Sequence, residues 1–160
     1  MPNIINNFSY PALTDTQSSA VLTLGTLVNL DDGGQAVYVQ AASEISQYNA
    51  VCIPATNIAT NATTARVANT KRVGFAQVSI ASGQYGWVQL GGKVRVNVSA
   101  SCLPGVALYT TTTEGRLDDA TVSGALVAGV VTELTASATS AMTAVAAYTM
   151  VIPVPANVTP

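Results

Sequence analysis

Residues 72–110 read RVGFAQVSIASGQYGWVQLGGKVRVNVSASCLPGVALYT. Apolar residues recur at every second position in three runs of this stretch, and the pairs Ser82-Gly83, Gly91-Gly92 and Pro104-Gly105 separate the runs. A period of two indicates strands with one buried face, and Gly or Pro pairs between the runs indicate tight turns. The stretch therefore predicts successive antiparallel strands in the middle of a β domain.

The flanking segments extend this pattern. In chain order, the further strands expected are residues 20–28, 35–40, 50–53, 125–134 and 142–152. Residues 41–49 are expected to form a short helical turn or an irregular loop, and residues 55–70 a surface loop with the option of a short strand at 65–67. The sequence thus predicts an all-β fold, either a compact antiparallel β-barrel or a β-sandwich.

The two halves of the chain resemble each other. AVYVQAASEISQYNAVCIP leads after a loop to VGFAQVSIASGQYGWVQLG, and KVRVNVSASCLPGVALYT leads after a loop to AGVVTELTASATSAMTAVAAYTMVIP. The spacing from Ile45 to Gly74 nearly equals the spacing from Cys102 to Gly129. We therefore expect a duplicated β unit, at about residues 35–91 and 92–152, because one unit alone has few strands with which to close a core.

The ends of the chain differ from its middle. The expected division is an extended N-terminal arm at 1–20, a β domain at 21–153 and a Pro-rich tail at 154–160 that cannot add ladder hydrogen bonds. Phe8, Tyr10 and Leu13 are apolar exceptions in the polar arm. Because a free arm gains nothing from exposed aromatic side chains, we expect the arm to dock on its own domain or on a neighbour.

The composition is unusually poor in charge. Charged residues make up 9% of the 160 residues, against about 25% in an ordinary soluble domain, while hydrophobic residues make up 49%. Ser, Thr, Asn, Gln and Ala fill the difference and give a polar surface with little repulsion against association. The net charge is -2, and the few cations form no basic stripe, so nucleic acid is not an expected partner.

The sequence shows no signal for membrane insertion or export. The first twenty residues lack the basic start and continuous apolar core of a Sec signal. The most apolar run, residues 141–155, is interrupted by Thr and Pro and is shorter than the roughly 20 residues that a spanning helix needs. We therefore expect no membrane partner, and synthesis in the cytoplasm without export.

The residues offer little for catalysis. The chain contains no histidine, which removes Ser-His-Asp and Cys-His nucleophile activation and His-based metal sites. A Ser-Lys pair with Lys71 or Lys93 is formally possible, but the strand alternation points Lys93 outward. The acidic pairs Asp31-Asp32 and Asp118-Asp119 lie beside turns and match neither a glycosidase pair nor a calcium loop. We expect no enzymatic activity, no cofactor and no metal site.

The remaining distinctive residues have structural interpretations. Cys52 and Cys102 lie in apolar runs and are expected to be buried thiols. Trp87 is expected in the core with Tyr85 and Gln89 on its face, and a sugar-stacking platform is the alternative. Four Asn-X-Ser/Thr sequons arise by chance in so Asn- and Thr-rich a chain, at Asn7, Asn61, Asn97 and Asn157.

Five short features follow one another between about residues 35 and 152. They are a Gly-led strand (VGFAQ), a Gly hairpin into VQLGG, a Pro-Gly turn before a strand (LPGVALYT), an acidic turn (EGRLDD) and a second Gly-led strand (AGVV). In these features the chain resembles the capsid decoration proteins, or cement proteins, of tailed bacteriophages.

The resemblance implies a structural virion protein on the outer capsid surface. Proteins of this family are small, β-rich and often homotrimeric, and they clamp neighbouring copies of the major capsid protein at three-fold or quasi-three-fold positions. The residues then expected at the capsid or subunit interface are Asn3, Phe8, Tyr10, Leu13, Asn57, Asn61 and Asn69. The alternative is a trimeric head-fibre or tail knob that binds a receptor or a glycan, which a cluster of exposed aromatic residues would favour.

Overall fold

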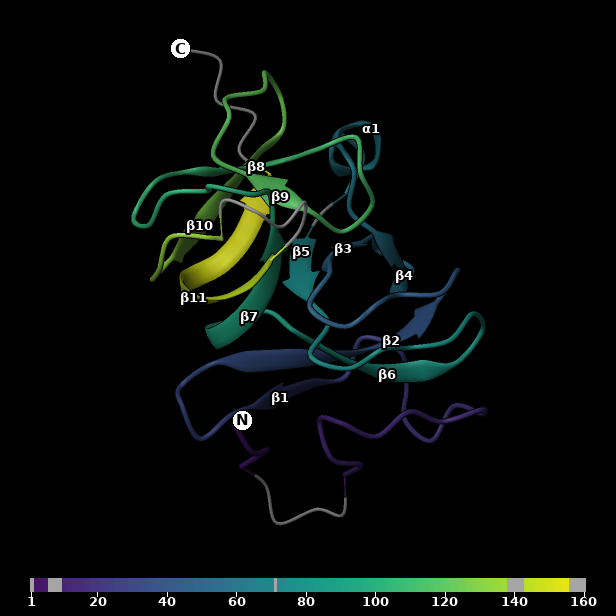
Figure 1. The fold of residues 1–160 in the computed structure, drawn as a ribbon. Helices are drawn as coiled ribbons and strands as arrows, with labels where there is room; N and C mark the ends of the chain where they lie inside the picture. Colours follow the sequence, from purple (N-terminus) through teal and green to yellow (C-terminus); the bar gives the residue numbers. More distant parts are fainter. Residues whose placement is uncertain (1, 6–9, 71, 138–142, 156–160) are drawn as a thin grey trace.

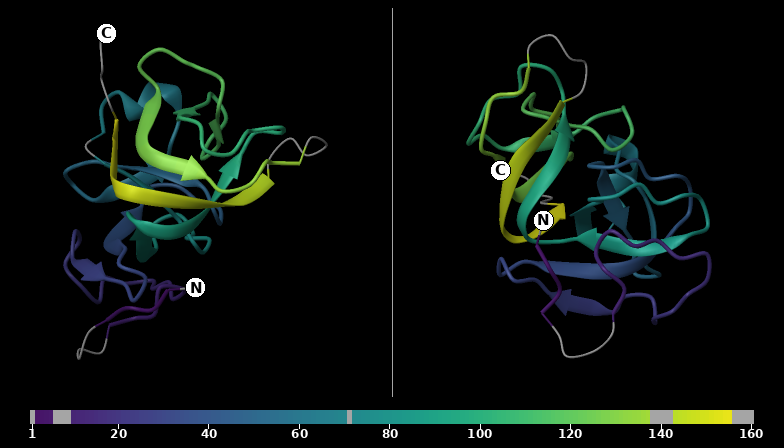
Figure 2. Two further views of the ribbon diagram at one scale, coloured as in Figure 1. Left: turned by 90° about the vertical axis from the view of Figure 1, so that its left-hand side faces the viewer. Right: turned by 60° about the horizontal axis from the view of Figure 1, so that its bottom comes forward.

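The computed structural model describes residues 2–5, 10–70, 72–137 and 143–155. Its fold is nearly all β, with two curled β units side by side and the N-terminal arm against the outer side of the first (Figures 1 and 2). In these residues the one helix is α1 (Thr64–Val67). No helix in the described part of the chain is long and apolar enough to cross a membrane.

The first unit is a six-stranded sheet that curls back on itself. Its strands are β1 (Leu27–Asn29), β2 (Gln35–Ala41), β3 (Ala50–Ile53), β4 (Ile58–Asn61), β5 (Arg72–Phe75) and β6 (Tyr85–Gln89). Their order is β1-β2-β4-β3-β5-β6, and β6 also pairs with β2. The β2–β4 pair is parallel and the other pairs are antiparallel.

The second unit is a closed five-stranded barrel. Its strands are β7 (Gly92–Val98), β8 (Leu108–Thr110), β9 (Leu117–Asp118), β10 (Leu126–Thr132) and β11 (Thr143–Pro155). The order around the barrel is β10-β11-β7-β9-β8. The β7–β9 pair is parallel and the others are antiparallel. The expected all-β barrel is therefore confirmed, with one parallel pair in each unit that the alternation did not indicate.

The two units share one topology. The pairs β2–β4, β4–β3, β3–β5, β5–β6 and β6–β2 recur in the same order as β7–β9, β9–β8, β8–β10, β10–β11 and β11–β7. A loop contact recurs too: Ile45 exchanges two backbone hydrogen bonds of 2.9 Å with Ile80, and the carbonyl of Cys102 accepts one of 2.9 Å from the N–H of Ala136. This is the arrangement that a tandem duplication predicts.

The equivalent strands β2 and β7 differ on their outer faces. Both have seven residues, and both carry buried valines at their inward positions, Val37, Val39, Val94 and Val96. At the matching outward positions, the first unit has Ala36 and Tyr38, both 0% exposed, whereas the second has Lys93 and Arg95, both exposed. Lys93 thus points outward as predicted. The chemical difference follows from what covers each face.

The N-terminal arm covers the outer face of β2 and β6. Ile4 forms a β-bridge with Leu30, and Gln17 exchanges two backbone hydrogen bonds of 2.9 Å with Tyr85. The indole N–H of Trp87, which is 1% exposed, donates to the carbonyl of Pro11 at 3.1 Å. The arm therefore docks on its own domain, and Trp87 is a core residue as expected. The buried cluster that contains Trp87 lies between the sheet and the arm rather than inside the curled sheet.

A second core joins the two units. Val73 and Phe75 of β5 belong to the same buried cluster as Val96 of β7, Leu108 of β8 and Val130 of β10. Strand β5 of the first unit also lies close to strand β11 of the second unit. Burial of apolar surface in one shared cluster ties the units together, because neither can separate without exposing it.

Three local predictions are wrong. Residues 20–28 do not form one strand. They fold in turns, in which the N–H of Gly25 donates to the carbonyl of Tyr38 and the carbonyl of Thr26 accepts from the N–H of Tyr38, and the strand is limited to β1. The segment 55–70 contains β4 and a helix rather than a strand at 65–67, because the Thr63 hydroxyl caps the helix by accepting from the N–H of Arg66 at 3.3 Å. The last strand continues to Pro155, which pairs with Val127, because proline is tolerated where its missing N–H is not needed by the neighbouring strand.

Candidate functional site

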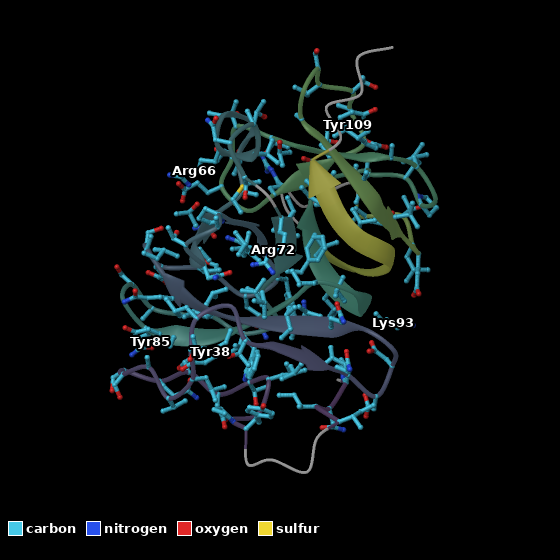
Figure 3. The ribbon with its side chains drawn as sticks, turned by 180° about the vertical axis from the view of Figure 1, so that it is seen from behind. Tyr38, Arg66, Arg72, Tyr85, Lys93 and Tyr109 are labelled. Carbon is cyan, nitrogen blue, oxygen red and sulfur yellow. The ribbon has the colours of Figure 1, made fainter. Side chains whose placement is uncertain are left out.

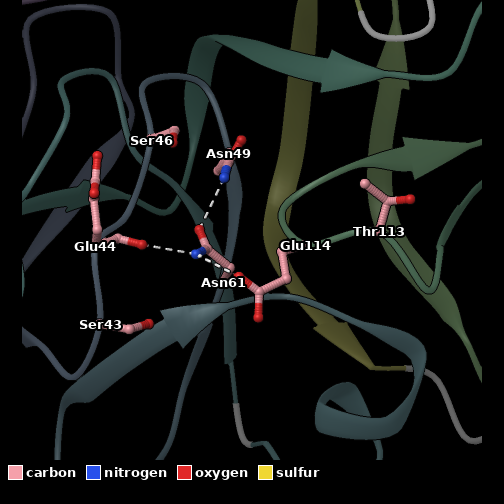
Figure 4. Close-up of a pocket in the computed structure, with 7 residues that line it drawn as sticks. All are labelled: Ser43, Glu44, Ser46, Asn49, Asn61, Thr113 and Glu114. Carbon is pink, nitrogen blue, oxygen red and sulfur yellow. Dashed lines mark hydrogen bonds between the residues drawn. The ribbon is translucent and has the colours of Figure 1, made fainter.

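A polar cavity of about 460 Å³ lies where the two units meet. It is formed by the loop after β2, by β4, and by the turn between β8 and β9 (Figure 4). The lining residues are Ser43, Glu44, Ser46, Asn49, Asn61, Thr113 and Glu114. The lining therefore offers hydroxyl, amide and carboxylate groups from both units.

Buried asparagines form the base of this cavity. Asn49 and Asn61 are 5% and 4% exposed, and the Nδ2 of Asn49 donates to the Oδ1 of Asn61 at 2.9 Å. Asn61 donates in turn to the carbonyl of Glu44 at 2.9 Å and to the Oε2 of Glu114 at 3.3 Å. From β7, Asn97 donates to the Oδ1 of Asn49 at 2.9 Å. Satisfied amides in a buried network hold their neighbours in one geometry, so this series of hydrogen bonds fixes the second unit against the first.

The turn that carries Glu114 is fastened to the first unit. The Glu114 carboxylate accepts from the guanidinium of Arg66 at 2.6 Å, in a pair whose side chains are 53% and 42% exposed. The N–H of Gly115 donates to Ala62 at 2.9 Å, and its carbonyl accepts from Ala50 at 2.8 Å. A Cβ at Gly115 would lie 2.1 Å from the Cγ of Asn49. The close approach thus requires glycine.

The chemistry available in this cavity is hydrogen bonding. Its lining contains serine and threonine hydroxyls, and the chain has no histidine to serve as their base. One of its two carboxylates is engaged by Arg66. In the described residues, no group of three or more His, Cys, Asp or Glu side chains is placed to hold a metal ion.

The interface residues expected from the sequence do not form one surface. Asn3 is exposed and binds the Asp31 carboxylate through its N–H at 2.9 Å and its Nδ2 at 3.2 Å. Asn69 is exposed just after α1, at the end of the molecule opposite the arm (Figure 1). Phe8 lies outside the described residues.

The other expected interface residues have roles inside the fold. Tyr10 is half-buried with its ring edge-to-face on Trp87, at 6.2 Å between centroids. Leu13 is 6% exposed in the core under the arm, and Asn61 belongs to the buried network. Asn57 is half-buried, adopts φ +57° in the turn before β4, and accepts a hydrogen bond from Arg72.

The acidic pairs have the turn role that the sequence indicated. The two carboxylate oxygens of Asp32 accept from the N–H groups of Gly34 and Lys93, both at 2.9 Å. Asp32 thereby holds the connection between the units, which passes through Gly91-Gly92. Asp119 accepts from the N–H of Leu103 at 2.9 Å and holds a loop of the second barrel.

Both cysteines are buried free thiols, as expected. Burial raises the pKa of each thiol to about 11, with Asp119 and Asp118 adding to the effect at Cys102. A thiol that stays protonated is a poor nucleophile, so these cysteines pack as small apolar side chains.

The asparagine network is the part that sequence reasoning missed. Asn97 stands in the alternating run of β7 next to buried valines, and this polar residue in a buried stretch was the available signal. Asn61 and Asn97 both belong to sequons, but their side-chain amides are buried and hydrogen-bonded, which agrees with chance occurrence.

No protein-family model, curated protein sequence or solved structure matches the chain.

Proposed function

We propose that this protein is a capsid decoration protein of a tailed bacteriophage, which binds the outside of an assembled shell and stabilises it by clamping neighbouring coat subunits. The observation that carries the proposal is the sequence resemblance, two of whose features fall at equivalent places in the two units. VGFAQ and AGVV lie on or beside β5 and β10, which have the same position in the two topologies.

The character of the surface supports a role in protein contacts. Only 9% of residues are charged, and among the described residues two ion pairs form, Arg66–Glu114 and Lys93–Glu133. A nearly uncharged polar surface carries little electrostatic cost when it lies against other protein. The barrel of the second unit is closed, so it has few unpaired strand edges to which other copies of the chain could add at high local concentration.

Stabilisation in this way needs no chemical reaction. A protein that binds only the assembled shell stabilises it by mass action, and several weak contacts from one oligomer combine as avidity. Of the interface residues expected from the sequence, Asn3 and Asn69 are exposed and are the contacts we propose. They lie on the arm and after α1, at two ends of the molecule, which suits a protein that bridges two neighbours.

The test uses shells assembled from the major capsid protein of the same virus. The purified chain is mixed with assembled shells and with unassembled coat protein, and each mixture is sedimented. We expect the chain to pellet with shells to a fixed stoichiometry and to raise the temperature at which they disassemble. A chain that stays in the supernatant, or that binds unassembled coat protein equally well, would refute the proposal.

The oligomeric state is tested separately by light scattering over a dilution series. Since one chain has a mass of 16.3 kDa, a homotrimer gives a mass on the order of 49 kDa. A monomer at every concentration contradicts an intrinsic trimer. Asn69→Asp should weaken shell binding, with Asn29→Asp, also exposed, as the matched control.

A further inference from the structure

A second cavity, of about 490 Å³, lies within the arm. Its lining comes from two nearby stretches, residues 10–17 and 21–22. Tyr10 and Leu22 of this lining pack against the buried cluster that contains Tyr38, and Tyr38 and Tyr85 lie together (Figure 3). The lining residues are Tyr10, Pro11, Asp15, Gln17, Val21 and Leu22. The volume falls in the range of about 300–1,000 Å³ that small-molecule sites occupy.

A hydrogen-bond relay fixes the orientation of Gln17 in this lining. The N–H of Val21 donates to the hydroxyl oxygen of Tyr38 at 3.5 Å, and that hydroxyl donates to the Oε1 of Gln17 at 2.9 Å. Burial raises the pKa of Tyr38, which keeps the hydroxyl protonated and able to donate. With Oε1 engaged, the Nε2 of Gln17 has two N–H groups and no partner among the described residues.

Asp15 supplies the complementary group. Its Oδ2 accepts from the N–H of Ala12 at 3.0 Å, which fixes the side chain, and its Oδ1 has no partner among the described residues. The lining thus includes a carboxylate acceptor and an amide donor, and each of the two side chains is held by a hydrogen bond to the protein. Preorganised polar groups of this kind are what give small-ligand sites their selectivity.

The rest of the lining is apolar. Val21 is 54% exposed, a high value for a side chain of its kind, and Pro11 and Leu22 lie beside it in the lining. The ring of Tyr10 is braced edge-to-face against Trp87, with an interplanar angle of 87°. The cavity therefore combines an aromatic and aliphatic surface with a fixed donor and acceptor.

We propose that this cavity is a carbohydrate site that takes one pyranose ring. A sugar has an apolar C–H face, which suits Pro11, Val21 and Leu22, and hydroxyl groups that both donate to Asp15 and accept from Gln17. A basic side chain would use only the carboxylate and would meet the N–H donors of Gln17 with like polarity. The lining therefore favours a diol over a cation. This inference is independent of capsid binding.

The test is saturation-transfer NMR on the full-length protein with four probes, the methyl glycosides of glucose, galactose, mannose and N-acetylglucosamine. At least one should receive saturation at its ring C–H protons and be displaced by the free sugar. Gln17→Glu keeps an oxygen for the Tyr38 hydroxyl and removes both donors, so affinity should fall on the order of tenfold. Asn29→Asp makes the same charge change at an exposed position outside the cavity and should leave binding unchanged.

Three results would overturn the inference. The first is no transfer to any of the four glycosides with the wild-type protein. The second is equal binding by Gln17→Glu, with its fold verified by the emission of the single tryptophan. The third is binding of N-acetyl-lysine methylamide in preference to the glycosides, which would mean that the cavity recognises a basic side chain.

Discussion

Replacement of Gly115 by alanine should be one of the most destabilising single changes in the chain. Gly115 adopts φ +70°, and alanine in the left-handed region costs about 1–2 kcal/mol. Its Cβ would also lie 2.1 Å from the Cγ and 2.3 Å from the Nδ2 of Asn49, so Asn49 must move. That movement breaks the buried bonds to Asn61 and Asn97, and each orphaned group costs about 1–3 kcal/mol. We therefore expect Gly115→Ala to cost at least about 3 kcal/mol.

Gly105 and Gly124 provide matched controls for this prediction. They have φ +70° and +72°, but a Cβ at either position meets nothing within 4 Å. Gly105→Ala and Gly124→Ala should therefore cost only the backbone term of about 1–2 kcal/mol. The free energy of unfolding of all three variants is measured by urea denaturation. If Gly115→Ala costs no more than the controls, the asparagine network does not hold the two units together.

Three further predictions concern the cores and the ion pair. Cys52 and Cys102 should react slowly with Ellman's reagent at pH 8 in the native protein and fully in denaturant. Because their folded pKa of about 11 exceeds the ordinary 9, stability should be complete below pH 9 and fall as the pH rises toward 11. The double alanine variant should show a smaller fall, since Tyr38, whose pKa burial also raises, still contributes. Leu13→Ala should cost about 2–5 kcal/mol, measured by urea denaturation, and an unchanged midpoint would show that the arm is not part of the core. Glu114→Gln should cost at most about 1 kcal/mol, because the pair with Arg66 is half exposed and the amide oxygen still accepts from Asn61; a larger loss would show that the charge itself is needed.

The sequence predicted the features that depend on local pattern. Alternation of Val94 and Val96 with Lys93 and Arg95 located β7 and the direction of its side chains, because period two is a property of any half-buried strand. The similarity of the halves indicated two duplicated units, and the same order of strand pairs recurs in the two sheets. The parallel β2–β4 pair could not be predicted, since strand pairing depends on which distant segments meet.

The cavities escaped prediction for the same reason. Glu44, Asn61 and Glu114 have no sequence spacing that suggests a site, and only the contact between the units brings them to one cavity. The sequence marks Asn97 only as part of a sequon, although an amide that is buried in a valine-rich strand needs hydrogen-bond partners. Its partner, Asn49, comes from the other unit. The arm was expected to dock, but the residues that it covers became known only from the structure.

The covered face of the first unit makes the two halves of the chain non-interchangeable. After a duplication, each half could in principle take either place, but the first carries Ala36 and Tyr38 on the outer face of β2 where the second carries Lys93 and Arg95 on β7. With the halves exchanged, the arm would close over Lys93 and Arg95 while the aromatic rings met water. The arm and the face beneath it are therefore complementary, and the backbone at Pro11 is tied to a tryptophan 76 positions further along the chain.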